Sequence, residues 1–357
     1  MKKERNIGMD LLKIFAMIGV IVLHYNNKGI GKAFVYAPLF SNKSYVLYFL
    51  QSMFICAVNV FVMISGYFMS GSTKVSIKKP IRLLVQVVVF RELIYIVKTL
   101  CHGKSLYAPF LWQFLLPTSW FAILYVALYF VAPYLNRLLK SLNDKSFGIF
   151  VNLIFILFSI WPFTVDVIQE WTGLTLNGLS SVTRSGSDSG YTIVNFVLVY
   201  LLGAAVRRKG TRDKLWVNVI KLLSCWVILF LSAYYLETHE GNTSLIFAYS
   251  NPLVILSAVY LLQLFGRIKL KANPVVTSIA GSTFSVYLLN STLIAELFNT
   301  EFYVKNNGLL MLLHIAWTCL SICGMSYLAQ LLYDLITKPI YKLLDKLFPR
   351  DFCLRAE

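Results

Sequence analysis

The chain has 357 residues, of which 58% are hydrophobic, 15% aromatic and only 14% charged, and its mean hydropathy is +0.68. Soluble domains carry about 25% charged residues, so this composition excludes an ordinary soluble protein and indicates a lipid-embedded one. The net charge of +17 does not indicate nucleic acid as a partner, because the basic residues stand in short loops between apolar stretches, where they meet membrane lipid headgroups.

Apolar stretches recur along the whole chain, and each is long enough to cross a hydrocarbon core of about 30 Å. In chain order, ten spans are predicted at residues 7–25, 45–69, 81–100, 120–135, 147–163, 191–206, 215–236, 245–265, 275–298 and 309–336. We therefore predict an all-α, polytopic membrane protein. Residues 1–336 would form a single membrane-embedded domain, and residues 337–357 a basic amphipathic tail in the cytoplasm.

The positions of the basic residues predict the orientation of these spans. Of the 33 Lys and Arg residues, 23 fall in loops on the N-terminal side, six in loops on the opposite side and four within spans. Cytoplasmic loops of membrane proteins are enriched in Lys and Arg. Both termini are therefore predicted to be cytoplasmic, and the number of spans to be even.

The first span carries two ionisable residues, Lys13 and His24, on one face. Such groups cost free energy when they are placed inside a membrane. Eleven residues lie close to three helical turns, so the two side chains align, with His24 about 16 Å further toward the outer boundary. Asp10 lies one turn before Lys13 and is placed to pair with it. A histidine can take a proton from a hydroxyl, and a cation deeper on the same face suits an anionic donor. An interfacial histidine and a snorkelling lysine explain the spacing equally well.

Other polar groups interrupt later spans. Arg91 and Glu92 in the third span predict either a buried ion pair or an anion site at Arg91. Asn59 and Ser65 in the second span and Asn290 in the ninth are small polar residues that commonly hold helices together. Helix packing is the simpler interpretation of these three, and a place in a polar site is the alternative.

Trp120 begins the fourth span, at a boundary where aromatic residues collect regardless of function. The six cysteines are scattered without metal-ligand spacing, so no metal site is predicted. The sequence contains no motif typical of soluble hydrolases, zinc proteases or nucleotide-binding folds. The polar groups inside the spans are therefore the candidate functional residues.

Five segments, in order and on matching spans, resemble those of the acyltransferase-3 family of bacterial membrane enzymes, which acylate cell-surface carbohydrates. They are Lys13 followed by ten residues and His24, residues 59–68 with their Ser-Gly-Tyr, residues 119–121 with 129–136, residues 189–191 with 200–203, and residues 281–290. The resemblance runs nearly from end to end. Ten spans with cytoplasmic termini also fit this family.

The chain departs from the family's pattern at two positions. The first helix of the family usually carries arginine where this chain has Lys13, which keeps the charge but loses the forked guanidinium. The ninth-helix segment often ends in histidine, and here that position is Asn290, which forms hydrogen bonds but does not titrate near pH 7. These two departures put in question which acyl donor the protein prefers and how active it is.

The resemblance implies a bacterial cytoplasmic-membrane O-acyltransferase that transfers an acyl group from acetyl-CoA to a polysaccharide or a lipid-linked oligosaccharide, without a metal. It implies that His24 is the general base. The residues expected to bind the acyl donor are Arg5, Lys13, Arg82 and Arg91. Those expected to bind the acceptor or support the site are Asp10, Asn59, Ser65, Trp120 and Asn290. A transporter of glycans or lipid-linked sugars and a catalytically altered homologue of the acyltransferases stay open as alternatives.

Overall fold

The computed structural model of the chain describes residues 6–102, 119–176, 188–210, 213–347 and 353–355. Its helices are α1 (Ile7–Asn26), α2 (Ala33–Tyr36), α3 (Asn42–Phe54), α4 (Ala57–Met69), α5 (Lys78–Cys101), α7 (Trp120–Ser141), α8 (Asp144–Phe155), α9 (Trp161–Thr172), α10 (Ile193–Lys209), α11 (Leu215–Thr238), α12 (Thr243–Ile246), α13 (Pro252–Gly266), α14 (Pro274–Gly281), α15 (Thr283–Leu297), α16 (Thr300–Asn306) and α17 (Gly308–Leu347). A π-helical turn, Ile156–Ile160, joins α8 to α9. A 3-10 turn, Asp188–Gly190, precedes α10. Strands β1 (Lys74–Ser76) and β2 (Cys353–Arg355) form a short antiparallel ladder.

The structure confirms a helical membrane protein. In the described part of the chain, six helical stretches are long and apolar enough to cross a membrane: Ile7–Asn26, Asn42–Met69, Trp120–Ser141, Asp144–Thr172, Leu215–Thr238 and Gly308–Leu347. The other predicted spans form helices that are shorter or more polar. Helices α10 and α13 have 17 and 15 residues, α5 contains several charged side chains, and α14 and α15 divide one predicted span between them.

Most helices begin at a polar residue whose side-chain oxygen accepts one of the first backbone N–H groups, which have no partner within the helix. Asn6 accepts from the N–H of Met9 at the start of α1, and Asn143 accepts from that of Ser146 at the start of α8. The apolar sequence between the caps then lets each helix enter lipid or the interior of the bundle.

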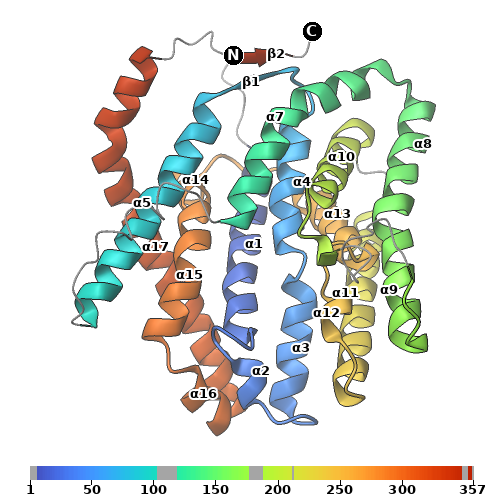
Figure 1. Ribbon diagram of the computed structural model, residues 1–357, viewed down its shortest axis with the longest axis vertical. Coiled ribbons are helices and arrows are strands. Elements are labelled where there is room, and N and C mark those ends of the chain that lie inside the picture. Colours follow the sequence, from blue (N-terminus) through green and yellow to red (C-terminus); the bar gives the residue numbers. More distant parts are fainter. Residues whose placement is uncertain (1–5, 103–118, 177–187, 211–212, 348–352, 356–357) are drawn as a thin grey trace.

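Helices α1 and α4 lie in the middle of the bundle, with α17 on one flank and α8 and α9 on the other (Figure 1). The flanking helices expose large apolar side chains such as Ile149 of α8 and Leu320 of α17. This is the pattern expected where lipid covers the surface. The first helix is therefore an interior element, held by neighbours on several sides.

Two of the predicted spans are broken where they pack against α1. The span at residues 45–69 is interrupted at Ile55 and Cys56, between α3 and α4. The span at residues 275–298 is interrupted at Ser282, between α14 and α15. All four of these helices contact α1. At the first break, Phe54 lies so close to Gly19 that a Cβ there would be 2.7 Å from the Phe54 ring.

Helices α4 and α10 pack closely against each other through glycine. A Cβ at Gly66 would lie 2.1 Å from the backbone oxygen of Tyr200, and one at Gly203 would lie 2.1 Å from that of Met63. Small residues allow such an approach because they leave no side chain between two backbones. The glycine of the Ser-Gly-Tyr segment at residues 65–67 thus has a packing role.

The loops that the sequence assigned to the N-terminal side contact one another at one end of the bundle. The contacts join Arg207 to the carbonyl oxygens of Tyr67 and Phe68, Arg208 to Asp144, Arg267 to the carbonyl oxygen of Asp213, and Lys78 to Asp345. The β1–β2 ladder brings the C-terminal segment to the same end. Helix α17 continues to Leu347, so residues 337–347 of the predicted tail extend this helix.

Candidate active site

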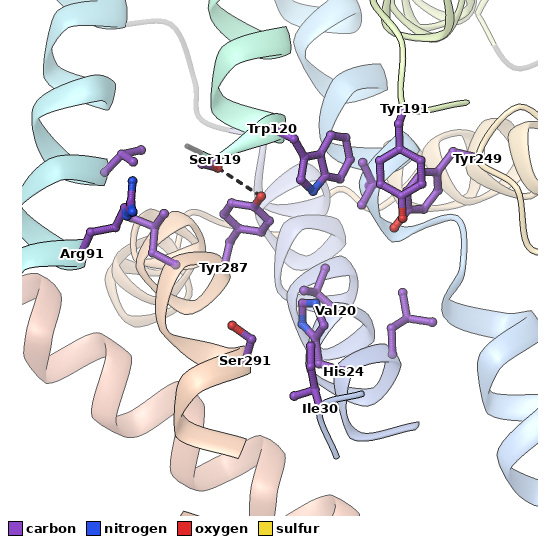
Figure 2. Close-up of a pocket in the computed structure, with 14 residues that line it drawn as sticks. Val20, His24, Ile30, Arg91, Ser119, Trp120, Tyr191, Tyr249, Tyr287 and Ser291 are labelled. Atoms are coloured by element: carbon purple, nitrogen blue, oxygen red, sulfur yellow. Dashed lines mark hydrogen bonds between the residues drawn. The ribbon is translucent and has the colours of Figure 1, made fainter. Parts of the chain in front are cut away.

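A cavity of about 390 Å³ opens beside the C-terminal half of α1. Residues from α1, α4, α5, α7 and α15, together with four loop positions, meet around it. They are Val20, Leu23, His24, Ile30, Val58, Val87, Arg91, Ser119, Trp120, Tyr191, Tyr249, Tyr287, Leu288 and Ser291. Figure 2 shows Arg91 on one side and Trp120, Tyr191 and Tyr249 on the other, with Tyr287 and His24 between them. Three of the predicted site residues, His24, Arg91 and Trp120, therefore face one space.

The Nδ1 atom of His24 forms a hydrogen bond with the side-chain oxygen of Asn290 on α15. Asn290 is fully buried, and its amide nitrogen donates to the carbonyl oxygens of Val286 and Tyr287 at 2.9 and 2.8 Å. These two bonds fix the amide, because the opposite orientation would set its oxygen against two carbonyl oxygens. Only the oxygen of Asn290 can then face His24.

An amide oxygen accepts hydrogen bonds but never donates, so the proton of neutral His24 resides on Nδ1. The other ring nitrogen, Nε2, then carries a lone pair. A histidine held in one tautomer by a fixed partner is the usual arrangement of a general base. Asn290, the departure from the family pattern, thus holds the catalytic candidate in the tautomer that general-base chemistry needs.

An aromatic wall formed by Trp120, Tyr191 and Tyr249 bounds the cavity opposite Arg91. The ring centroids of Trp120 and Tyr191 are 4.6 Å apart, and those of Tyr191 and Tyr249 are 5.0 Å apart. Trp120 stacks over Tyr249 with a centroid distance of 6.0 Å. Such a wall offers apolar faces together with phenol hydroxyls, which suits a ligand that is itself part apolar and part polar.

The backbone around the wall is positioned by polar contacts. Asn59 of α4 donates to the carbonyl oxygen of Tyr249 at 2.8 Å, and the N–H of Tyr249 donates to the carbonyl oxygen of Ser189 at 2.9 Å. Gly190 adopts a φ of +81°, and a Cβ there would lie 2.5 Å from the backbone nitrogen of Ser250. Only glycine fits such a position without strain. Asn59 and Gly190 therefore support the wall from behind.

A pair of hydroxyl side chains also lines this cavity. The hydroxyl oxygens of Tyr287 and Ser119 are 3.2 Å apart, and Ser119 also caps the first turn of α7. Tyr287 precedes Asn290 by three residues on α15, so both side chains lie on the face turned toward α1. Tyr287 was not predicted, although this spacing from Asn290 was readable in the sequence.

Ser65, Lys13 and Arg82 do not line this cavity. Lys13 and Asp10 form the ion pair expected from their spacing, with 3.6 Å between Nζ and Oδ1, and Thr277 donates to Asp10 at 3.3 Å. Ser65 bonds to the carbonyl oxygen of Phe61 and meets the hydroxyl of Tyr125, each at 3.1 Å.

The Arg82 side chain is engaged at the basic end of the bundle. It donates to both carboxylate oxygens of Asp345, at 3.2 and 3.3 Å, and its guanidinium lies over the ring of Tyr341. Arg5 lies outside the described residues. In the ranges that the structure describes, no group of three or more His, Cys, Asp and Glu side chains could hold a metal ion.

The comparison with known proteins gives one family. The model of a family described as an acyltransferase domain matches residues 6–333, which is nearly the whole chain and includes every described residue around the cavity. No curated protein and no solved structure gave a significant match.

Proposed function

The chain belongs to this acyltransferase family, and from that premise we propose that it is an O-acyltransferase with acetyl-CoA as donor and a carbohydrate hydroxyl as acceptor. The acceptor would be a surface polysaccharide or a lipid-linked oligosaccharide. The observation that carries this proposal is the His24–Asn290 pair at a cavity with an aromatic wall. The pair leaves a basic nitrogen free, and the wall offers a surface for a sugar.

In this mechanism His24 acts as general base. Its Nε2 removes the proton of the acceptor hydroxyl while the hydroxyl oxygen bonds to the thioester carbonyl carbon. The carbon–sulfur bond then breaks, the acyl group stays on the acceptor as an ester, and the imidazolium returns the proton to the CoA sulfur. Asn290 keeps the imidazole oriented throughout, because its oxygen holds the Nδ1 proton.

Arg91 supplies positive charge to the same cavity. Negative charge develops on the thioester oxygen when the hydroxyl attacks, and a cation nearby stabilises it. The hydroxyls of Tyr287 and Ser119 are further groups that can donate to that oxygen. The aromatic wall lies opposite Arg91 and would hold the sugar ring by its apolar face.

We extend the proposal to the topology. Ten membrane crossings with both termini in the bacterial cytoplasm would place the cluster of basic loops on the cytoplasmic side. The acyl donor would then enter from the end where Lys13 and Arg82 lie, and the acceptor from the end where α1 finishes. Support comes from the contacts among Arg207, Arg208, Arg267 and Lys78 with neighbouring loops, which gather these basic segments together.

One feature also fits a glycan transporter, because α1 is flanked by two broken helices, and such helices line the substrate sites of many transporters. A single experiment separates the two functions. Vesicles containing the full chain are given acetyl-CoA labelled in the acetyl group on one side and a glycan on the other. We expect ester-linked label on the glycan. Movement of the glycan with all label remaining on CoA would favour the transporter and contradict the acyltransferase.

A further inference from the structure

A second cavity, of about 400 Å³, lies at the basic end of the bundle. It is formed where the end of α4 meets α7, α8 and α10. Its lining residues are Ser70, Gly71, Leu139, Lys140, Phe147, Ala204, Arg207 and Arg208. Val58 of α4 lines the first cavity and Ser70 lines the second, so the two are about 18 Å apart along the same helix. The second cavity is therefore separate from the His24 site.

One wall of this cavity is held rigidly by a buried polar network. The side-chain amide of Asn136 donates to the carbonyl oxygens of Met69 and Ser72, at 2.8 and 2.7 Å. The hydroxyl of Tyr200 donates to the side-chain oxygen of Asn136 at 2.8 Å, and neither residue is exposed. A fully satisfied buried network of this kind fixes its surroundings. The turn that presents Ser70 and Gly71 is thus preorganised rather than loose.

The cavity carries more positive charge than its surroundings neutralise. Arg208 pairs with Asp144 at 2.8 Å. Arg207 donates to the carbonyl oxygens of Tyr67 and Phe68, which are neutral groups at the end of α4. Among the described residues, Asp144 is the only carboxylate in an ion pair with a lining residue of this cavity. Arg207 and Lys140 therefore leave the cavity with a net positive charge.

Three other lining side chains are apolar and buried, and they lie close to the apolar flank formed by α8. Leu139, Phe147 and Ala204 line the cavity beside the cations. Further along α8, Ile149 and Leu153 are among the exposed large apolar residues. A ligand that fits both the cationic and the apolar residues of this cavity has a phosphate next to an apolar portion. Basic pockets between membrane helices on the cytoplasmic side bind lipid headgroups of this kind.

We propose that this cavity binds a phosphate ester, and that the apolar lining and the lipid-facing flank assign it to the headgroup of an anionic phospholipid. The phosphate lies between Lys140 and Arg207, against the turn at Ser70 and Gly71. The site would tie α4, α7, α8 and α10 together at the membrane surface. This proposal does not depend on acyl transfer, because no residue of the His24 cavity takes part in it.

The test measures lipid binding to the full chain purified in neutral detergent, by native mass spectrometry. Phosphatidylglycerol is the anionic probe, and phosphatidylcholine is the zwitterionic comparison. Lys140→Gln removes one cation and should weaken phosphatidylglycerol binding about fivefold, since each basic residue near an anionic surface contributes roughly 1 kcal/mol. Lys145→Gln is the matched control, because Lys145 is an exposed lysine at the start of α8 that does not line the cavity. The Lys145→Gln variant should bind phosphatidylglycerol as tightly as the unchanged chain does.

The outcomes separate the possible sources of the phosphate. The proposed site would be wrong if Lys140→Gln and Lys145→Gln weakened phosphatidylglycerol binding equally. It would also be wrong if phosphatidylglycerol and phosphatidylcholine bound equally well to the unchanged chain. If coenzyme A displaces phosphatidylglycerol from the unchanged chain and loses this ability in Lys140→Gln, the site belongs to a soluble phosphate ester and the lipid assignment is wrong. Thermal unfolding of each variant shows whether it remains folded, so a loss of binding can be distinguished from a loss of structure.

Discussion

His24 and Asn290 show what can and cannot be predicted at the scale of single residues. The spacing from Lys13 placed His24 on a polar face of the first helix, and the structure shows it at a cavity. Pairing with Asn290, 266 positions away in the sequence, could not be predicted from local pattern, because it depends on how α15 packs beside α1. Tyr191 and Tyr249 were missed for the same reason, because their positions around the cavity follow from tertiary contacts alone. Tyr287 lies three residues before Asn290, and that spacing was a signal in the sequence.

Asn290 allows a direct test of the proposed tautomer. Asn290→Leu removes the oxygen that holds the Nδ1 proton, so we expect turnover to fall about 10- to 100-fold, the range typical when a supporting partner of a histidine is lost. Asn290→Asp keeps an acceptor toward His24 but sets its second oxygen against the carbonyl oxygens of Val286 and Tyr287, so its activity should lie between those of the leucine variant and the unchanged chain. The measurement is steady-state acyl transfer by each purified protein. Equal turnover in Asn290→Leu and the unchanged chain would show that the hydrogen bond is dispensable.

At the scale of helices, hydropathy predicted where most elements lie but not where they break. The break at Cys56 is invisible to hydropathy, because apolar residues continue on both sides of it, whereas Ser282 stands between Gly281 and Thr283 as a short interruption of an otherwise apolar span. Each break lies where a neighbouring helix packs against α1. The π-helical turn before Trp161 has a local signal that was not used, since Pro162 cannot donate a backbone hydrogen bond.

The glycine contacts between α4 and α10 predict a large effect from a small change. Gly66→Ala or Gly203→Ala would place a methyl group about 2.1 Å from a backbone oxygen of the other helix, so the helices must separate. We expect each variant to lose about 1–3 kcal/mol of stability, as overpacked sites do. The readout is the thermal unfolding midpoint in detergent.

Gly324→Ala is the matched control, because Gly324 lies within helix α17 and a Cβ there meets nothing within 4 Å. Alanine is the better helix former, so this variant should be as stable as the unchanged chain or slightly more stable. A lower midpoint in Gly324→Ala than in Gly66→Ala would show that the close α4–α10 approach does not limit stability.

At the scale of the whole molecule, the sequence predicted a helical membrane protein and its family, and both are confirmed. The membrane class could be predicted because the hydration of Lys and Arg restricts them to loops, a constraint that acts without detailed packing, whereas the orientation from charge counting stays a prediction. The number of crossings is harder to predict, since helices shielded by neighbours need not be long or uniformly apolar. Helix α5 illustrates this, because it carries Arg91 into the cavity and Arg82 to the basic end.

The proposed orientation predicts which exposed positions react from outside an intact cell. Glu240 follows α11 at the end opposite the basic loops, whereas Lys145 lies at the start of α8 among them. We expect Glu240→Cys to react with a membrane-impermeant maleimide in intact cells, and Lys145→Cys only after the membrane is permeabilised. The unchanged chain measures the background from its own cysteines. The reverse pattern would invert the topology and the proposed donor side.

The central claim is that His24 is the general base for acyl transfer, and the most direct measurement is turnover of labelled acetyl-CoA to a glycan ester by the purified His24→Ala protein. The account predicts that turnover falls to background. His239→Ala, which changes an exposed loop histidine, should leave it unchanged. Turnover equal to that of the unchanged chain in His24→Ala would contradict the claim.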